Sequence, residues 1–295
     1  MTSGWIHEYA FSIHSPPERI FTALTSAAEL EQWFAEHAEV EPTPGGAFRF
    51  WGRHTVGRPR KQDATGKVVA SEPDRHLAFT WPLFGVPTTV TITLTPEETK
   101  KGPATKVAVQ HALEAMIDQP RPKEMVEDWW RFALGNLRAH TTGRGQVMRP
   151  DFADPSPEVR VSMTVDAPPA TVFRALIEPD ALNQWLAKDA TVEPRVGGRF
   201  DLGWKQDSDL EHEGAAMQIL EFVPNEKLTI SWPDWRGDAS VPAQSVTWLL
   251  AAEGDGTRVT LIHAGFTRAV DMSDYPFGWW GFLSRLARVA KSLED

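Results

Sequence analysis

Cysteine is absent from the 295-residue sequence, which excludes disulfide bonds, thiolate metal sites, iron–sulfur clusters and cysteine nucleophiles. The nine histidines are scattered without the spacing of metal ligands, so we expect no metal site. The sequence also lacks the motifs G-x-x-x-x-G-K-S/T, H-E-x-x-H and G-x-S-x-G. Nucleotide-binding, zinc-protease and serine-hydrolase functions are therefore not indicated, and we expect no cofactor.

Long apolar segments are lacking as well. No run approaches the roughly 20 residues that cross a bilayer, and Met1–Phe11 has neither the basic region nor the apolar region of a secretory signal. We therefore expect a cytoplasmic protein with no membrane span. The formal net charge of −10 repels phosphate backbones, so nucleic acid is not an expected partner, and the sequence identifies no protein partner.

Tyrosine is scarce and tryptophan abundant, with 2 tyrosines against 13 tryptophans. Hydrophobic residues make up 41% of the chain and charged residues 24%, values typical of a soluble globular protein. Tryptophan supplies a large apolar area with one polar group. This composition predicts a deep core or a pocket lined by aromatic side chains.

The sequence repeats itself with a period of about 152 residues. Segments Pro16–Phe48 and Pro168–Phe200 align without a gap and are identical at 16 positions. The pairs that follow in the same order are Trp81-Pro82 with Trp232-Pro233, His111-Ala112 with His263-Ala264, and Trp129-Trp130 with Trp279-Trp280. A unit of this length is a whole domain, so the repeat indicates a tandem duplication.

The segment between the copies has the composition of a linker. Thr141–Pro157 is rich in glycine, proline and aspartate and shows no hydrophobic periodicity. We therefore predict a first domain at residues 1–143, a linker at 144–155 and a second domain at 156–295.

Each copy contains the same order of expected elements. In the first copy, Trp5–His14 alternates like a half-buried strand, two short helices follow, and a series of strands leads to a helical pattern over Lys123–His140. This order predicts an α+β domain in which a curved antiparallel sheet wraps around one long C-terminal helix. We expect the paired residues Trp33/Trp185 and Phe48/Phe200 to be buried.

Paired glycines precede a strand in both copies. Gly45-Gly46 and Gly197-Gly198 lack the following helix that a phosphate-binding loop requires. We therefore interpret them as turn residues.

The motif F-x-A-L, L-x-Q-W-F/L, V-E-P-x-x-G-G-x-F, followed by W-P, V-P and a terminal helix with W-W, resembles the heat-shock-protein-90 ATPase activator homologue-like family. That family lies within the SRPBCC superfamily of START-like, helix-grip proteins, and the resemblance covers nearly the whole chain, once per copy. It implies two tandem helix-grip domains, each a seven-stranded antiparallel sheet around a C-terminal helix with an apolar cavity between them. Functions vary widely across this fold.

Candidate ligand-binding residues fall at equivalent places in both copies. Alternation within each strand puts His111 and His263 on the same face as apolar neighbours. Such a histidine either presents a polar group to a cavity or is a core residue with its own hydrogen bonds. The proposed binding set is Trp81, His111 and Trp129 in the first copy, and Trp232, His263 and Trp279 in the second.

Aromatic residues on inward faces either pack a simple core or line a pocket for a flat or extended apolar ligand. In the first copy, the side chains expected to point inward are Trp33, Phe48, Phe50, Phe79, Trp81, Trp129 and Trp130. In the second copy they are Trp185, Phe200, Trp204, Trp232, Trp248, Trp279 and Trp280. We favour a pocket in at least one copy, and two such pockets on a short linker could form one elongated cavity.

The expected function is the binding of a hydrophobic small molecule of polyketide, polyene or lipid-like type. The resemblance extends to START-like proteins of natural-product clusters, including self-resistance proteins of enediyne producers. A polyketide cyclase or aromatase is an alternative, although no carboxylate pattern orients His111 or His263 and catalytic residues stay unknown. A cochaperone-like interaction module is a third, so the sequence leaves open whether the protein is an enzyme.

The hairpin loops after Trp51 and Trp204 carry opposite charge. The first contains Arg53, Arg58, Arg60 and Lys61, and the second contains Asp207, Asp209, Glu211 and Glu213. They are either two solvated loops or surfaces that attract one another.

Overall fold

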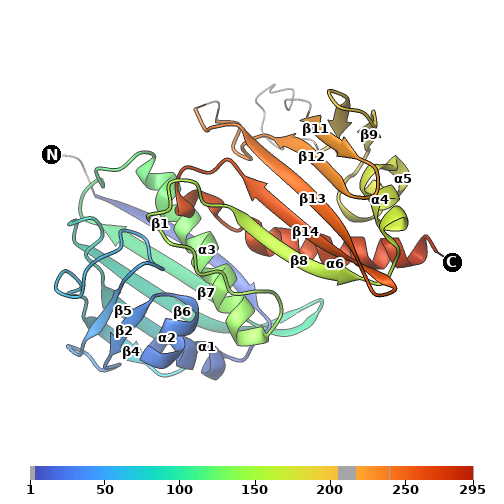
Figure 1. Cartoon of the computed structure of the whole chain (residues 1–295). Helices are drawn as coiled ribbons and strands as arrows, with labels where there is room; N and C mark the ends of the chain where they lie inside the picture. The colour runs from blue at the N-terminus through green and yellow to red at the C-terminus, as the bar shows by residue number, and fades with distance from the viewer. Residues whose placement is uncertain (1–3, 205–216, 239, 295) are drawn as a thin grey trace. The chain divides into compact units, whose positions relative to one another are not determined.

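The computed structural model describes residues 4–204, 217–238 and 240–294 (Figure 1). The chain forms two compact units. We call Met1–Pro155 together with Arg268–Asp274 domain one, and Ser156–Thr267 together with Tyr275–Asp295 domain two. The acidic loop residues Asp207, Asp209, Glu211 and Glu213 lie outside the described residues.

Domain one contains seven strands and three α-helices among its described residues. In chain order these are β1 (Trp5–Ile13), α1 (Pro17–Thr25), α2 (Ala27–Trp33), β2 (His37–Val40), β3 (Phe48–Trp51), β4 (Val68–Glu72), β5 (His76–Thr80), β6 (Thr88–Thr99), β7 (Gly102–Leu113) and α3 (Pro122–Thr142). The sheet order is β1-β7-β6-β5-β4, and β2 and β3 form a separate pair. An isolated bridge between Ala47 and Lys67 connects this pair to β4. Helix α3 lies against one face of the sheet (Figure 1).

Domain two repeats this arrangement. Its elements are β8 (Val159–Val165), α4 (Pro169–Ile177), α5 (Pro179–Trp185), β9 (Thr191–Val192), β10 (Arg199–Asp201), β11 (Met217–Val223), β12 (Lys227–Trp232), β13 (Gln244–Glu253), β14 (Gly256–Ala264) and α6 (Tyr275–Ser292). The strands form one seven-stranded sheet in the order β8-β14-β13-β12-β11-β10-β9. A short 3-10 helix, η1 (Ala269–Met272), precedes α6 in the chain. Both halves are therefore helix-grip domains, as the sequence predicts, although the sheet of domain one is divided.

In each copy, the pairing register of the longest hairpin determines which side chains share a face of the sheet with the buried histidine. In domain one, His111 of β7 lies opposite Val90 of β6. In domain two, His263 of β14 lies opposite Val246 of β13. Because side chains alternate across a strand, the residue two positions before each valine shares its face with the histidine. Those residues are Thr88 and Gln244.

The repeated Gly-Gly pairs form tight turns, and their residue type has a steric cause. A Cβ atom on Gly46 would stand 2.3 Å from the carbonyl oxygen of Glu41, and one on Gly198 would stand 2.1 Å from that of Glu193. Gly45 and Gly197 have φ values of 87° and 74°. Only glycine adopts such a backbone without strain, so the pairs are turn residues.

The landmark residues of the repeat lie in the two cores. Trp33, Trp185, Phe48 and Phe200 are all buried, which confirms the expectation. Trp33 Nε1 donates to the carbonyl of Ala23 at 3.1 Å, and Trp185 Nε1 makes the equivalent bond to Ala175 at 2.9 Å.

Two aromatic residues expected to point inward do not lie in the core. Trp204 is 42% exposed, and Trp280 is only half-buried. Trp204 lies after β10, where its ring contacts those of Trp232 and Phe282 and Nε1 donates to the carbonyl of Leu186. Trp280 lies beside Trp279 on the helix, and adjacent helical residues point in different directions, so one of the two faces away from the sheet.

The linker is fixed to domain one at three places. Asn136, buried in α3, donates to the carbonyl of Met148 at 2.8 Å and accepts from the Met148 amide at 2.8 Å. The Phe152 amide donates to the carbonyl of Arg53 at 2.9 Å, and the Phe152 ring packs 5.5 Å from that of Trp129. His54 Nδ1 lies 2.9 Å from the carbonyl oxygen of Pro150. This segment therefore follows the surface of domain one.

Candidate functional site

An aromatic cluster lies where the sheet of domain one faces α3. Trp81 directly follows β5, His111 lies in β7, and Trp129 and Trp130 lie in α3. The Trp81 ring stacks on His111 with centroids 5.3 Å apart and planes inclined by 11°. The Trp129 centroid lies 5.9 Å from that of Trp81. The structure therefore brings the three candidate residues of the first copy together, and all are buried.

A chain of hydrogen bonds fixes His111 within this cluster. Trp130 Nε1 donates to His111 Nδ1 at 3.1 Å, because an indole nitrogen is only a donor. Nε2 of the neutral ring therefore carries the proton and donates to Thr88 Oγ1 at 2.8 Å. The Thr88 hydroxyl in turn donates to the carbonyl of Trp81. Both ring nitrogens are engaged, and the chain holds Trp81 in place.

Domain two contains an equivalent cluster. Trp279 Nε1 donates to His263 Nδ1 at 3.1 Å, and His263 Nε2 donates to Gln244 Oε1 at 2.8 Å. The Trp232 centroid lies 5.8 Å from that of His263 and 5.0 Å from that of Trp279. The candidate residues of the second copy are thus also together and buried.

The two Trp-Trp pairs are offset by one position relative to the pairing read from the sequence. The tryptophan that donates to the histidine is the second of the pair in domain one, Trp130, but the first in domain two, Trp279. The separation along the chain from histidine to donor is 19 residues in domain one and 16 in domain two. Trp279 therefore corresponds to Trp130, and the place of Trp129 is taken by Gly278.

Burial lowers the pKa of both histidines to about 3, with a smaller contribution from His7 at His111. Each ring is therefore neutral near pH 7. A general acid or base works best with a pKa near the operating pH and a free nitrogen facing its substrate. Neither His111 nor His263 meets these conditions, so their geometry favours the interpretation as core histidines that fix their aromatic neighbours.

Two indole N–H groups of the first cluster lack an acceptor among the described residues. Nε1 of Trp81 and Nε1 of Trp129 are buried and make no hydrogen bond. The other buried side-chain atoms of this kind are Trp5 Nε1, His7 Nε2, Arg49 Nε, Thr55 Oγ1, Trp248 Nε1 and Ser273 Oγ. A buried donor without an acceptor costs about 1–3 kcal/mol, so each needs an explanation. Sequence patterns identify such tryptophans as apolar positions but cannot show where their N–H groups point.

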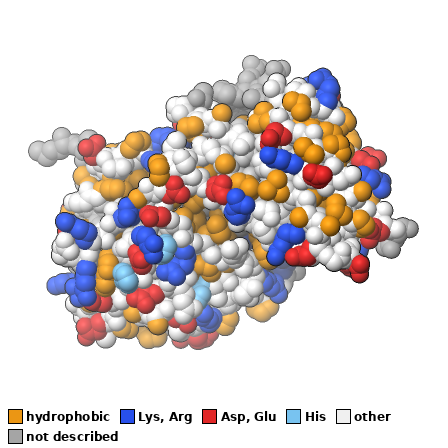
Figure 2. Space-filling view, in the orientation of Figure 1, with side chains coloured by type: hydrophobic (Ala, Val, Ile, Leu, Met, Phe, Trp, Pro, Cys, Tyr) orange, Lys and Arg blue, Asp and Glu red, His pale blue; other side chains and the backbone are white. Residues whose placement is uncertain are grey.

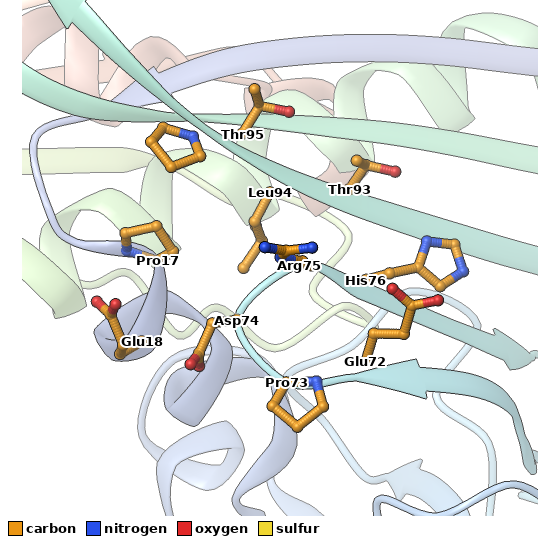
Figure 3. A pocket seen from close by; sticks show the side chains of 11 residues that line it. Pro17, Glu18, Glu72, Pro73, Asp74, Arg75, His76, Thr93, Leu94 and Thr95 are labelled. Carbon is orange, nitrogen blue, oxygen red and sulfur yellow. The ribbon is translucent and has the colours of Figure 1, made fainter.

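The grooves found on domain one lie elsewhere, and one of them faces the turn between β4 and β5. It has a volume of about 740 Å³ and is shown in Figure 3. Its charged side chains are Glu18, Glu72, Asp74 and Arg75, and His76 lies at its edge. Two further grooves, of about 460 and 510 Å³, are likewise lined without any of the six candidate residues. Open, charged grooves of this kind differ from the enclosed apolar pockets that bind small molecules.

The basic loop of domain one forms its ion pairs within that domain. Arg53 pairs with Glu36, Arg58 with Asp151, Arg60 with Asp63, and Lys61 with Glu39. Acidic and basic side chains are interspersed on the visible face of this domain in Figure 2. These pairs favour the interpretation of a solvated loop over that of an attracting surface.

The described part of the chain meets neither the requirements of a metal site nor those of a membrane-spanning helix. No three His, Asp or Glu side chains gather there as metal ligands would. None of the helices described is both long and apolar enough to span a membrane.

Fold and clusters together define a tandem helix-grip protein with a neutral aromatic centre in each half. The chain belongs to the activator of Hsp90 ATPase homolog 1-like family, whose model matches residues 14–142 and 166–291. The match covers both copies, which confirms the resemblance described above. Among curated proteins, no match was found.

The chain is similar to solved structures that match about half of it and to one that matches nearly all of it. An AHSA1-like protein from Rhizobium etli is 31% identical over 46% of this chain and 82% of its own, with a TM-score of 0.38. CalU16 from Micromonospora echinospora is 27% identical over 46% of this chain and 83% of its own, with a TM-score of 0.36. DynU16, described as a protein of the dynemicin biosynthetic locus, is 17% identical over 97% of this chain and 98% of its own, with a TM-score of 0.40.

Proposed function

We propose that the protein binds a hydrophobic small molecule of polyketide, polyene or lipid-like type between a sheet and its long helix. The observation that carries this proposal is the buried cluster of Trp81 and Trp129, whose indole N–H groups have no acceptor among the described residues. Folded proteins rarely leave such donors unpaired. A ligand that enters between the rings would supply both apolar contact and an acceptor.

The surroundings of the cluster suit an apolar ligand. The rings in contact with Trp81 and Trp129 are those of Phe34, Phe50, His111, Trp130, Phe132 and Phe152. All are uncharged, since His111 is neutral. Apolar burial yields about 25 cal/mol per Å², so a linear apolar molecule needs no charged anchor to bind. A carrier or self-resistance role in natural-product biosynthesis is the biological setting that we propose.

Fluorescence titration with methyl parinarate, a linear tetraene ester, tests this proposal. Binding should quench tryptophan emission and enhance emission of the tetraene in a saturable way. We expect Trp129→Ala to weaken binding at least tenfold, because its ring lies in the cluster. Trp235→Ala is the matched control, since this indole is 42% exposed and contacts Arg236. An absence of saturable binding by the wild-type protein would contradict the proposal.

A further inference from the structure

The two copies differ in the hydrogen bond made by one indole N–H group. Trp81 and Trp232 occupy equivalent places, each beside the buried histidine and the donor tryptophan of its helix. In domain two, Trp232 Nε1 donates to the hydroxyl of Tyr275 at 3.3 Å. In domain one, Trp81 Nε1 has no acceptor among the described residues.

The cause of this difference lies one helical turn before the donor tryptophan. Tyr275 precedes Trp279 by one turn of α6, and its ring also packs 4.4 Å from that of His263. The residue that precedes Trp130 by one turn of α3 is Val126, which is buried and has no side-chain acceptor. Domain two therefore supplies from its own helix the acceptor that domain one lacks.

Domain one also has a second donor at this point. Trp129 Nε1 is buried without an acceptor, and its ring centroid lies 5.9 Å from that of Trp81. The corresponding position of domain two is Gly278, which has no side chain. Two neighbouring rings of domain one thus each carry a buried N–H group without an acceptor among the described residues, in a neutral, aromatic cluster. Among its described residues, domain two retains one buried donor without an acceptor, Trp248 Nε1, and the Trp248 ring lies edge-to-face with that of Trp279 at 6.0 Å.

We infer that domain one is the half that binds ligand, and that its ligand presents a neutral carbonyl oxygen to Trp81 and Trp129. This inference rests on the binding function proposed above and adds the chemical class of the ligand. A carbonyl oxygen has two lone pairs and can accept from two donors. A carboxylate would be buried without a positive partner among these rings, and a pure hydrocarbon would leave both donors unpaired. Ketones, esters and quinones meet the requirement.

A pair of ligands that differ only at the carbonyl tests the inference by calorimetric titration. One is methyl parinarate, and the other is the parent C18 tetraene hydrocarbon, which lacks the ester. We expect the wild-type protein to bind the ester at least tenfold more tightly, with one ester per chain. If both ligands bind with equal affinity, the inference is wrong while the binding function stands. If neither binds, the binding function itself fails.

Conservative variants test whether the N–H groups of Trp81 and Trp129 cause the preference for the ester. Trp81→Phe and Trp129→Phe each keep an aromatic ring and remove the N–H group, so we expect each to weaken ester binding about tenfold and to leave hydrocarbon binding unchanged. Trp232→Phe is the matched control, because its N–H group is already bonded to Tyr275 and lies in the other domain. An unchanged ester preference in both domain-one variants would overturn the inference.

A measurement on the wild-type protein covers the case in which a variant fails to fold. In proton–nitrogen correlation spectra, the ester should shift two indole N–H resonances downfield and slow their exchange with solvent, whereas the hydrocarbon should not. Unshifted indole N–H resonances at saturation with the ester would contradict a hydrogen bond to the ligand.

Discussion

Trp33 and Trp185 show how one side chain serves two demands in each copy. The indole ring fills the space under the short helices, and its N–H group satisfies a backbone carbonyl of the preceding helix. Both side chains are almost fully buried. A substitution at either position therefore removes apolar contact and leaves a carbonyl unpaired.

We predict that Trp33→Ala destabilises domain one, and Trp185→Ala domain two, by about 3–5 kcal/mol. The cost combines the lost transfer free energy of the ring with a cavity that the neighbouring strands cannot close. Urea unfolding followed by circular dichroism measures it. Trp235→Ala is the control, because an exposed ring contributes only about 0.5 kcal/mol or less. A loss below about 1 kcal/mol in both core variants would show that these sites can collapse.

The buried histidines make stability depend on pH. Each folded-state pKa is about 3, whereas the ordinary value is 6.5, so the unfolded chain binds more protons between these values. The contribution is complete above about pH 6.5 and is lost as pH falls towards 3. We predict a slope of up to about 1.4 kcal/mol per pH unit for each histidine in this window.

Variants separate this effect from the titration of carboxylates. His111→Gln removes the titrating ring, so the free energy of unfolding of domain one should depend less on pH between 6.5 and 4 than in the wild type. Gln146→Ala changes an exposed side chain that does not titrate, and it should leave the slope unchanged. Equal slopes in the wild type and His111→Gln would indicate that His111 charges readily in the folded state.

At the scale of elements, the linker behaves as part of domain one. Asn136 makes three hydrogen bonds from a buried place in α3: two to the backbone of Met148 and one to the carbonyl of Trp33. Met148 is thereby held against the domain, and Phe152, whose amide donates to the carbonyl of Arg53, packs its ring against that of Trp129.

Asn136→Ala should release the linker and destabilise domain one by about 1–3 kcal/mol, because the backbone groups of Met148 and Trp33 lose their partners. We expect trypsin to cleave after Arg144 faster in this variant than in the wild type, as mass spectrometry of the fragments would show. Gln146→Ala changes an exposed linker side chain and should cleave at the wild-type rate. An unaltered cleavage rate in Asn136→Ala would mean that other contacts hold the linker.

Much of the element order could be predicted from the sequence because the duplication samples each pattern twice. The alternation of β1, the helical spacing of α3 and the Gly-Gly turns occur in both copies and agree. Strand β2, His37–Val40, escaped prediction because its four residues have no clear alternation and closely follow the end of a short helix.

The candidate site was predictable in its members but not in its polar contacts. Trp81, His111 and Trp129 share inward faces, and so do their counterparts in the second copy. The sequence did not reveal that Tyr275 of domain two stands where domain one has Val126. The chain from His263 to its donor tryptophan is shorter than the chain from His111 to its donor, so an alignment of the two Trp-Trp pairs matches residues that are not structurally equivalent. Hydrogen-bond partners depend on how each long helix is positioned along its sheet, and hydrophobic patterns in the sequence do not determine that position.

For the molecule as a whole, the duplication has produced two cores of the same fold with different polar interiors. Each domain has its own sheet, long helix and histidine network, so each has the parts of a cooperative folding unit. One copy completes its hydrogen bond at Trp232 internally, whereas in the other the N–H groups of Trp81 and Trp129 have no acceptor among the described residues. The binding role that we propose for domain one, and not for domain two, follows from this difference.

This asymmetry predicts the response of thermal unfolding to ligand. Differential scanning calorimetry should show two transitions, which Trp33→Ala and Trp185→Ala assign by lowering one transition each. A ligand that binds only the folded state at a free concentration of about 100 times its Kd stabilises that state by about 2.7 kcal/mol. For a domain of this size, methyl parinarate should therefore raise the midpoint of the domain-one transition by about 5–10 °C and leave the other in place. A rise of both transitions would show that domain two also binds the ester, and a rise of the domain-two transition alone would reverse the assignment of the binding half.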